Sequence, residues 1–236
     1  MGAGPEPFER DVELNEGYRY TTNAPLSSRL ANERLTDATL ELVSLTGRTL
    51  IDVGCGDGTY TSELARRGSP SEVVGIDPSP GAVEVAALRY PLLRFEVGDT
   101  AWLEATAERF EVAVARGVLH HADDPARLVR AIARVAQTVV VIEPNGWNPV
   151  LKLIERTSSY HRAHGERSWR SSVIDGWLRE AGFVPARRMY AGLVPFFFPG
   201  PAARLLKALE PVVEWAGPLG RPALAVYAVR AARVES

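Results

Sequence analysis

Cysteine is almost absent from this sequence of 236 residues, since Cys55 is the single one. One cysteine excludes an intramolecular disulfide, which is typical of a protein of the reducing cytoplasm. The sequence has no run of about 18 apolar residues, so we expect no integral membrane segment. Its first residues do not combine basic residues with an apolar run, so we expect no secretory signal.

A basic excess is also lacking, because 27 lysine and arginine residues face 29 aspartate and glutamate residues, for a formal net charge of −2. A dedicated nucleic-acid binder usually carries a clear basic excess. The sequence also has no Asn-Pro-Pro-Tyr-like motif of base-flipping enzymes. Nucleic acid is therefore disfavoured as a partner. Apolar residues make up 46% and charged residues 24%, ordinary values that exclude a disordered or fibrous chain.

Short apolar runs alternate with helical patterns in the first two thirds of the chain. A helical face begins near Leu30, and further helices are predicted over 60–67 and 80–90 and from Asp124-Pro125, an N-cap followed by an N1 proline. Such alternation predicts right-handed crossovers and a mostly parallel sheet, and hence a doubly wound α/β fold. The predicted strands of this part are Thr49–Val53, Glu72–Asp77, Leu93–Val97, Phe110–Ala115 and Thr138–Ile142.

The last third follows a different pattern. A helix is predicted from Ser172 to near residue 182, a strand over 183–190, and a final strand over 223–232. Between these strands an amphipathic helix spans 201–215 and is interrupted by Pro211. Its apolar side chains share one helical face, which we expect to be covered by protein. The residues of that face are Leu205, Leu206, Leu209 and Val213.

A glycine-rich segment, Asp52-Val-Gly54-Cys55-Gly56-Asp-Gly58-Thr59, follows the first predicted strand. Glycine lets a backbone approach a ligand closely. A dinucleotide-binding G-x-G-x-x-G would place its third glycine where Thr59 stands. An NAD-dependent oxidoreductase is therefore the disfavoured alternative. The preceding carboxylate of Asp52 suits the ammonium group of an amino acid better than a pyrophosphate.

Two more acids follow the next two predicted strands. Asp77 ends the second strand, and Asp99 follows the third. Strand ends of an open α/β sheet face one crevice, where an acid can accept hydrogen bonds from ribose hydroxyls. An acid such as Asp99 can also accept from the exocyclic amine of an adenine. Each acid alone is equally typical of a turn or helix N-cap, but three in phase with a glycine-rich loop favour a ligand.

Taken together, these motifs resemble those of class I S-adenosylmethionine-dependent methyltransferases of the small-molecule, methyltransferase type 11-like kind. The matching segments are 52–58, 75–79, 98–101 and 116–125, in the family's order, over roughly residues 45 to 145. The resemblance implies a Rossmann-like, doubly wound, seven-stranded sheet, mostly parallel with an antiparallel last strand, and helical lid segments. It also implies S-adenosylmethionine as cofactor and S-adenosylhomocysteine as product.

The resemblance further implies roles by position. The methionine moiety is assigned to Asp52 and the glycine loop, the ribose to Asp77, the adenine to the Asp99 segment, and the sulfonium side to the segment after the fourth strand. A tyrosine ring near the sulfonium can face the cation. The cofactor-binding residues expected on this basis are Tyr20, Asp52, Gly54, Cys55, Gly56, Asp77, Pro78, Asp99, Thr100, Ala101, Arg116 and Gly117.

Histidine supplies the candidate general base, since it titrates near neutral pH. His120 and His121 follow the fourth predicted strand, beside the expected methyl group, although they can equally serve the loop structurally. His161 and His164, with Glu166, are too weak a pattern for a metal site, and we expect no metal. The basic cluster over 152–170 either meets an anionic group of the acceptor or forms an exposed helix.

We therefore expect a cytoplasmic enzyme that methylates a small, apolar molecule. Oxygen is the expected acceptor atom, in specialised metabolism or in quinone or lipid biosynthesis. Alternatives are N- or C-methylation, or a cofactor-binding protein without methyl transfer, and a homodimer is compatible with the sequence. One domain is expected over 1–236, with an N-terminal lid and helix (1–44), a cofactor-binding core (45–145) and a substrate side (146–236). Residues 15–28 and 191–221 are predicted to close over the cofactor and form the acceptor pocket.

Overall fold

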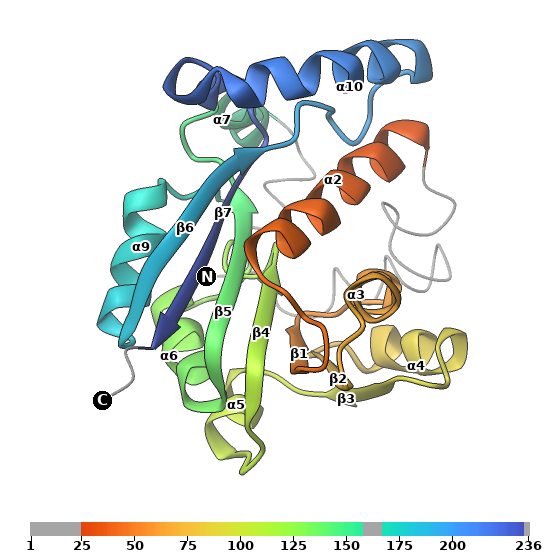
Figure 1. Ribbon diagram of the computed structural model, residues 1–236, viewed down its shortest axis with the longest axis vertical. Coiled ribbons are helices and arrows are strands. Elements are labelled where there is room, and N and C mark those ends of the chain that lie inside the picture. Colours follow the sequence, from red (N-terminus) through yellow and green to blue (C-terminus); the bar gives the residue numbers. More distant parts are fainter. Residues whose placement is uncertain (1–24, 158–166, 234–236) are drawn as a thin grey trace.

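The computed structural model describes residues 25–157 and 167–233 of the chain, and these form a seven-stranded sheet flanked by helices (Figure 1). The spatial order of the strands is β3-β2-β1-β4-β5-β7-β6. Only β7 runs antiparallel to its neighbours, which confirms the predicted α/β sheet with an antiparallel last strand. The strands are β1 (Thr49–Val53), β2 (Glu72–Asp77), β3 (Arg94–Val97), β4 (Phe110–Arg116), β5 (Ala136–Pro144), β6 (Phe183–Ala191) and β7 (Val226–Arg233).

Helices cover both faces of the sheet. Buried residues of α2 and α3 pack on one face, and those of α5, α6 and α9 pack on the other. The helices are α2 (Leu26–Leu42), α3 (Thr59–Gly68), α4 (Pro80–Arg89), α5 (Thr100–Ala105), α6 (Pro125–Val135), α7 (Pro149–Thr157), α9 (Ser171–Glu180) and α10 (Gly200–Trp215), with 3-10 turns η1 (Gly217–Leu219) and η2 (Arg221–Ala223). No described helix is both long and apolar enough to span a bilayer.

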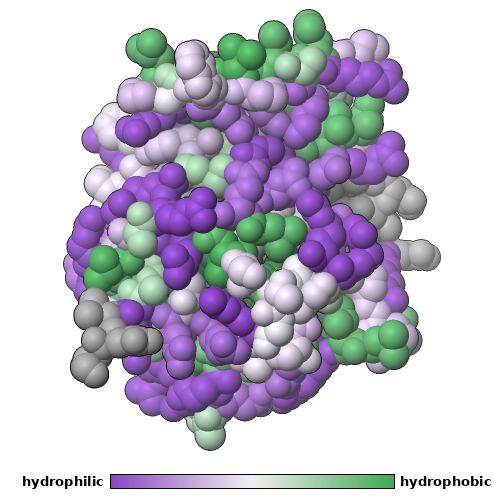
Figure 2. Space-filling view, viewed as in Figure 1, coloured by the Kyte–Doolittle hydropathy of each residue, from purple (hydrophilic) through white to green (hydrophobic). Residues whose placement is uncertain are grey.

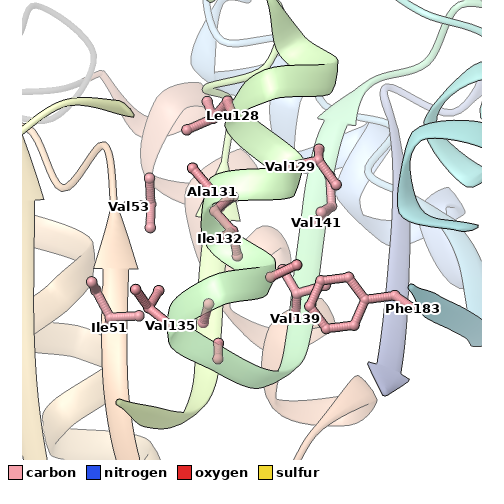
Figure 3. Packing of buried hydrophobic residues seen from close by; sticks show 14 of the residues in the cluster. Ile51, Val53, Leu128, Val129, Ala131, Ile132, Val135, Val139, Val141 and Phe183 are labelled. Atoms are coloured by element: carbon pink, nitrogen blue, oxygen red, sulfur yellow. The ribbon is translucent and has the colours of Figure 1, made fainter. Parts of the chain in front are cut away.

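The central strands are held in place by apolar side chains that pack alternately on the two faces of the sheet. Ile51 and Val53 of β1 pack beneath α6, while Leu50 packs on the opposite side with α2 (Figure 3). Neighbouring residues of a strand point to opposite faces, so a run that is apolar throughout must be covered twice. Full burial of each such side chain stabilises the fold by about 1.5–3 kcal/mol. These buried side chains hold each strand in a fixed orientation, and so they also fix the edge of the sheet at which each strand ends.

The strand order sets the position of the candidate site. β1 lies between β2 and β4, both parallel to it, so the crossover connections leave β1 and β4 in opposite directions. In open α/β sheets ligands bind outside the carboxyl ends of the strands at such a point. The glycine-rich segment, which follows β1, and the His120 segment, which follows β4, both start at this edge.

Several boundaries differ from those predicted from the sequence. The last strand starts at Val226, after η1 and η2, and α5 and α7 are additional helices. α7 begins where the Asn148 side-chain oxygen accepts from the backbone N–H groups of Val150 and Leu151. The predicted interruption at Pro211 is wrong, because α10 continues through it to Trp215. Proline removes one helical donor, and the contacts of the neighbouring turns hold the helix together.

The expectation that the apolar face of α10 is covered is wrong for Leu205 and Leu209, whereas Leu206 and Val213 of that face are half-buried. Leu205 is 63% exposed and Leu209 46% exposed. The sheet side of the helix is fixed instead by polar contacts. Glu210, which is 2% exposed, accepts a hydrogen bond from the backbone N–H of Leu193 at 2.9 Å. Glu214 pairs with Arg34 of α2. These contacts orient the two acids of α10 inward and leave Leu205 and Leu209 on the outside.

Candidate active site

The glycine-rich loop bends sharply after β1. Gly54, Gly56 and Gly58 all have positive φ angles, of 76°, 54° and 75°. A methyl group added to Gly54 would lie 2.5 Å from Cγ2 of Val118, in the segment after β4. Glycine is therefore required at residue 54 both by its backbone conformation and by this close approach. The loop after β1 and the segment after β4 are in direct contact.

Asp77 ties the glycine loop to the end of β2. Its two carboxylate oxygens accept from the backbone N–H groups of Gly56 and Ser79, each at 2.9 Å. The residue is 8% exposed, and this burial raises the pKa of the carboxyl group, against the opposing effect of the two hydrogen bonds. A carboxylate oxygen has further acceptor capacity beyond one bond. Asp77 thus shapes the loop and can still accept hydrogen bonds from a ligand.

Asp52 lies buried at the end of β1. Its Oδ2 accepts a hydrogen bond from the hydroxyl of Thr61 in α3 at 2.6 Å. Burial raises the pKa of Asp52 to about 6, while the Thr61 bond and the charge of Arg116 act in the opposite direction. At neutral pH the side chain is therefore mostly an anion inside the protein, a state that a nearby cation would stabilise.

Arg116, at the end of β4, holds α2 and α3 together. Its guanidinium donates to the Thr36 hydroxyl and to the backbone and side-chain oxygens of Asn32, each at 3.1 Å. The guanidinium carbon also lies 3.8 Å from the centre of the Tyr60 ring. This cation–π contact and the hydrogen bonds give the side chain a structural task at the edge of the site.

His120 forms a buried pair with Glu143. Nδ1 of His120 lies 2.7 Å from Oε2 of Glu143, which is wholly buried at the end of β5. Oε1 of Glu143 accepts from the backbone N–H groups of Val118 and Leu119, at 2.9 and 2.7 Å. The His121 ring lies beside that of His120, with 3.9 Å between centroids. Glu143 therefore fixes both the backbone after β4 and the His120 ring.

Glu143 was not predicted from the sequence, although a usable signal was present. It follows the fifth predicted strand in the same way that Asp52 and Asp77 end the first two. Acids at the carboxyl ends of parallel strands share one edge of the sheet. The same rule, extended to the fifth strand, would have found it.

Asp99 occupies a different environment from the other two acids. Its Oδ1 accepts from the backbone N–H groups of Ala101 and Trp102, at 2.9 and 3.0 Å, and the residue is exposed. It is thus the N-cap of α5, one of the two roles considered from the sequence. Thr100 and Ala101 form the first turn of that helix.

The remaining predicted residues have varied surroundings. Cys55 is buried, and burial raises the pKa of its thiol. Pro78 is exposed between Asp77 and the N-cap of α4, and Gly117 adopts a φ of 67° directly before the His120 segment. Tyr20, His161, His164, Glu166 and most of the 15–28 segment lie outside the described residues. Within 25–157 and 167–233, no group of three His, Cys, Asp or Glu side chains is placed to hold a metal ion.

Two of the basic residues after β5, Lys152 and Arg170, contact other parts of the protein. Lys152 Nζ donates to the Ser168 carbonyl at 2.7 Å and lies 3.0 Å from Glu155. The Arg170 guanidinium lies 4.6 Å from the centre of the Trp147 ring. These contacts favour the reading of this cluster as part of the folded surface.

Known sequences similar to this chain include methyltransferases. Residues 51–139 match the family model described as "Methyltransferase domain". A ubiquinone biosynthesis O-methyltransferase of Hahella chejuensis is 38% identical over 166 residues, 60% of this chain and 65% of the relative. The enzyme of the same name from Stutzerimonas stutzeri is 34% identical over 165 residues, 61% of this chain and 68% of the relative. The match spans just under two thirds of the first of these.

Solved structures share the fold at low sequence identity. Magnesium protoporphyrin IX methyltransferase of Synechocystis PCC 6803, solved with bound SAH, has a TM-score of 0.62 and 15% identity, covering 90% of this chain and 89% of that one. The (4+2)-cyclase SpnF has a TM-score of 0.69 and 20% identity, covering 98% and 95%. With the strand order, the glycine loop after β1 and the sequence relatives taken together, the chain belongs to the class I S-adenosylmethionine-dependent methyltransferases.

Proposed function

We propose that this protein transfers the methyl group of S-adenosylmethionine to an oxygen atom of a small, apolar acceptor. The observation that carries the proposal is the convergence of two segments, the glycine loop held by Asp77 and the segment after β4 that holds the His120–Glu143 pair. Relatives named for O-methylation in ubiquinone biosynthesis support oxygen as the acceptor atom and a quinone-like or lipid-like acceptor.

The residues at the strand ends fit this cofactor. The anion of Asp52 faces a low-dielectric interior and suits the ammonium of the methionine moiety. Asp77 keeps acceptor capacity for the ribose hydroxyls, and the α5 N-terminus at Asp99 suits the adenine. The absence of a Cβ at Gly54 allows close backbone approach. Backbone groups of the proposed site come from Cys55, Gly56, Pro78 and Gly117. Arg116 supports the site indirectly, through its hydrogen bond to Thr36 of α2.

His120 is proposed as the general base. The ionised carboxylate of Glu143 can only accept hydrogen bonds, so Nδ1 of His120 carries the hydrogen and donates it to Glu143. In the neutral ring, Nε2 is then the basic nitrogen. When bound, the cofactor supplies a methyl group already activated on a sulfonium. Nε2 of His120 would then accept the proton of the acceptor hydroxyl group, which makes the oxygen atom a better nucleophile. His121 packs against the same ring and is the second candidate.

The acceptor pocket is proposed between residues 15–28 and 191–221, which would close over the cofactor. The described parts of the two segments are in contact, since the hydroxyls of Ser27 and Ser28 both donate to the carbonyl of Phe196, at 2.8 and 2.7 Å. We place the reaction in the cytoplasm, in keeping with a single, buried cysteine. A small molecule rather than nucleic acid is the proposed partner, given the net charge of −2.

Calorimetry with S-adenosylhomocysteine tests the cofactor site. Asp77→Ala should weaken binding about 10- to 100-fold, because it leaves ligand and loop donors unpaired at about 1–3 kcal/mol. Asp175→Ala is the matched control, since Asp175 is another buried acid, bonded to Arg188 of β6 and Tyr227 of β7, several strands away from β2. Both variants should be less stable, but only the first should lose affinity. Equal affinity in all three proteins would contradict the assignment.

Transfer itself is tested with a labelled methyl donor and a panel of apolar phenols, catechols and reduced quinones, read as methylated product and S-adenosylhomocysteine. A cofactor-binding protein without methyl transfer is the second candidate, because a structure that shares the whole fold is a cyclase. Cofactor binding with an altered acceptor but no S-adenosylhomocysteine would favour that alternative. Methylation of nitrogen or carbon acceptors alone would refute the choice of oxygen.

A further inference from the structure

Helix α10 has its charged side toward the protein. Glu214 accepts from both Nε and Nη2 of Arg34, at 2.9 and 2.8 Å, and from the backbone N–H of Gly192 at 3.0 Å. Glu210 accepts from Leu193 and from Lys207, the latter within the same helix. A surface helix ordinarily buries its apolar face and exposes its charges. α10 departs from this pattern, because its two acids face inward together with Ala203 while several of its large apolar side chains are exposed.

The opposite side of α10 presents large apolar side chains to the outside. Leu205, Leu209, Val212 and Trp215 are 63%, 46%, 64% and 88% exposed. Their spacing of three and four residues places them in one stripe, here named the outer face of α10. α10 lies along one edge of the molecule, and Figure 2 shows hydrophobic surface along the same edge. The apolar surface continues into η1 with Leu219, which is 89% exposed.

The charges beside this face are of one sign. Within α10, η1 and η2 the acids are Glu210 and Glu214, both turned inward. Arg204 and Arg221 are exposed. The outer face is thus an apolar stripe with exposed cations near its two ends. Such a surface is complementary to an anionic, apolar environment rather than to water or to a basic protein.

We propose that the outer face of α10 docks on a lipid bilayer that carries anionic headgroups. A helix that lies in the plane of the interface buries its apolar side among the acyl chains near the headgroups. Exposed arginines then attract the anionic lipids, and Trp215 suits the boundary between headgroups and chains. α10 runs along the outer edge of the molecule (Figure 1), where a flat, deformable surface can reach it. The proposal does not depend on methyl transfer.

Sedimentation with lipid vesicles tests this docking, using the full chain and two compositions, phosphatidylcholine alone and phosphatidylcholine with phosphatidylglycerol. The parent should bind the anionic vesicles and bind the neutral ones more weakly. Leu209→Ser with Val212→Ser should reduce the partition coefficient about tenfold or more, because two inserting side chains are lost. Arg204→Gln with Arg221→Gln should remove the preference for anionic lipid while leaving weak binding to neutral vesicles.

The matched control is Leu88→Ser with Leu92→Ser. These leucines, in and after α4, are 75% and 97% exposed, so the control removes more exposed apolar surface than the Leu209/Val212 variant does, but away from α10. The control should bind vesicles as the parent does, and circular dichroism should show every variant folded. A parent that ignores both vesicle types, or a control that loses binding equally, would overturn the proposal. Light scattering that shows a dimer dispersed by the Leu209/Val212 variant, without vesicle binding, would assign the face to a second copy instead.

Discussion

The crevice at the ends of β1, β2, β4 and β5 and the outer helix α10 both contain buried acids, yet they use them differently. In the crevice Asp77 and Glu143 accept hydrogen bonds from the backbone of the loops after β1 and β4 and keep those loops in place. At α10 Glu210 and Glu214 accept from the backbone and from Arg34, and they attach a helix. Buried polar groups must be satisfied in both places.

The difference lies in what remains after the acids are satisfied. In the crevice the carboxylate of Asp77 can accept further hydrogen bonds, and Glu143 orients the His120 ring for the proposed reaction. At α10 both acids are used to attach the helix, and the apolar side chains of Leu205 and Leu209 lie on the surface. Loss of an acid in the crevice should therefore change function more than stability, and loss of a contact at α10 should change stability more than function.

The largest expected effect is on turnover at His120. His120→Ala should lower kcat about 10²- to 10⁴-fold, the usual contribution of a general base, with affinity for S-adenosylhomocysteine within about twofold of the parent. Glu143→Gln should lower kcat less and change the pH profile of kcat, because the amide cannot stabilise a protonated His120 in the same way. Steady-state kinetics with the best acceptor of the panel measures both. Unchanged kcat in the His120 variant would leave alignment alone as the mechanism.

The second largest expected effect is on the stability of the protein, through the attachment of α10. Arg34→Met should lower the free energy of unfolding by about 2 kcal/mol, because it leaves the partly buried Glu214 without its partner. Arg94→Met is the matched control, since Arg94 pairs with Glu108 on the surface and should cost under about 1 kcal/mol. Urea unfolding gives both values. Cofactor affinity should be the same in the two variants, and a selective loss in Arg34→Met would break the separation of the two regions.

Two glycines sharpen the comparison further. Gly54 and Gly47 have φ angles of 76° and 71°, but only Gly54 would place a Cβ against another residue, Val118. Alanine at either position should destabilise the protein by about 1–2 kcal/mol through backbone strain. Only Gly54→Ala should also weaken binding of S-adenosylhomocysteine, by about tenfold, because it displaces the segment after β4. Equal affinities in the two variants would show that this contact does not shape the site.

The smallest effect is a pH dependence at Asp52. Its pKa is raised from 3.8 to about 6, so the unliganded fold is favoured at acid pH, and this contribution is lost as pH rises from about 4 through 6. Binding of the ligand's ammonium requires the anion, so affinity should rise with pH up to about tenfold per unit below pH 6 and level off above 7. Calorimetry between pH 5 and 8 should show this slope in the parent and a flat profile in Asp52→Asn.

Much of the sheet was predictable because its signals are local. An apolar run such as Thr49–Val53 between turn residues predicts a buried strand, and Asp124-Pro125 predicts the start of α6, where Asp124 accepts from the N–H of Arg127. The acids at the ends of β1 and β2 were located by the same reasoning.

The direction of α10 was not predictable in this way. Its periodicity shows that Leu205 and Leu209 share a face, but a period contains no information on which way that face points. The direction is decided by the pairing of Arg34 with Glu214, residues 180 positions apart. The partner of His120 was missed for a similar reason, since His120 and Glu143 come from different strand ends.

The antiparallel β7 has a consequence for how the chain folds during its synthesis. β6 lies at the edge of the sheet and pairs only with β7 among the described strands, while β7 lies between β6 and β5. β2 to β5 can therefore each add beside a strand that already exists as the ribosome delivers the chain. β6 must wait, with α10 made in the interval, until β7 is added. The crevice can thus form early, whereas the α10 side of the molecule depends on a long-range pairing, which is the slower kind to form.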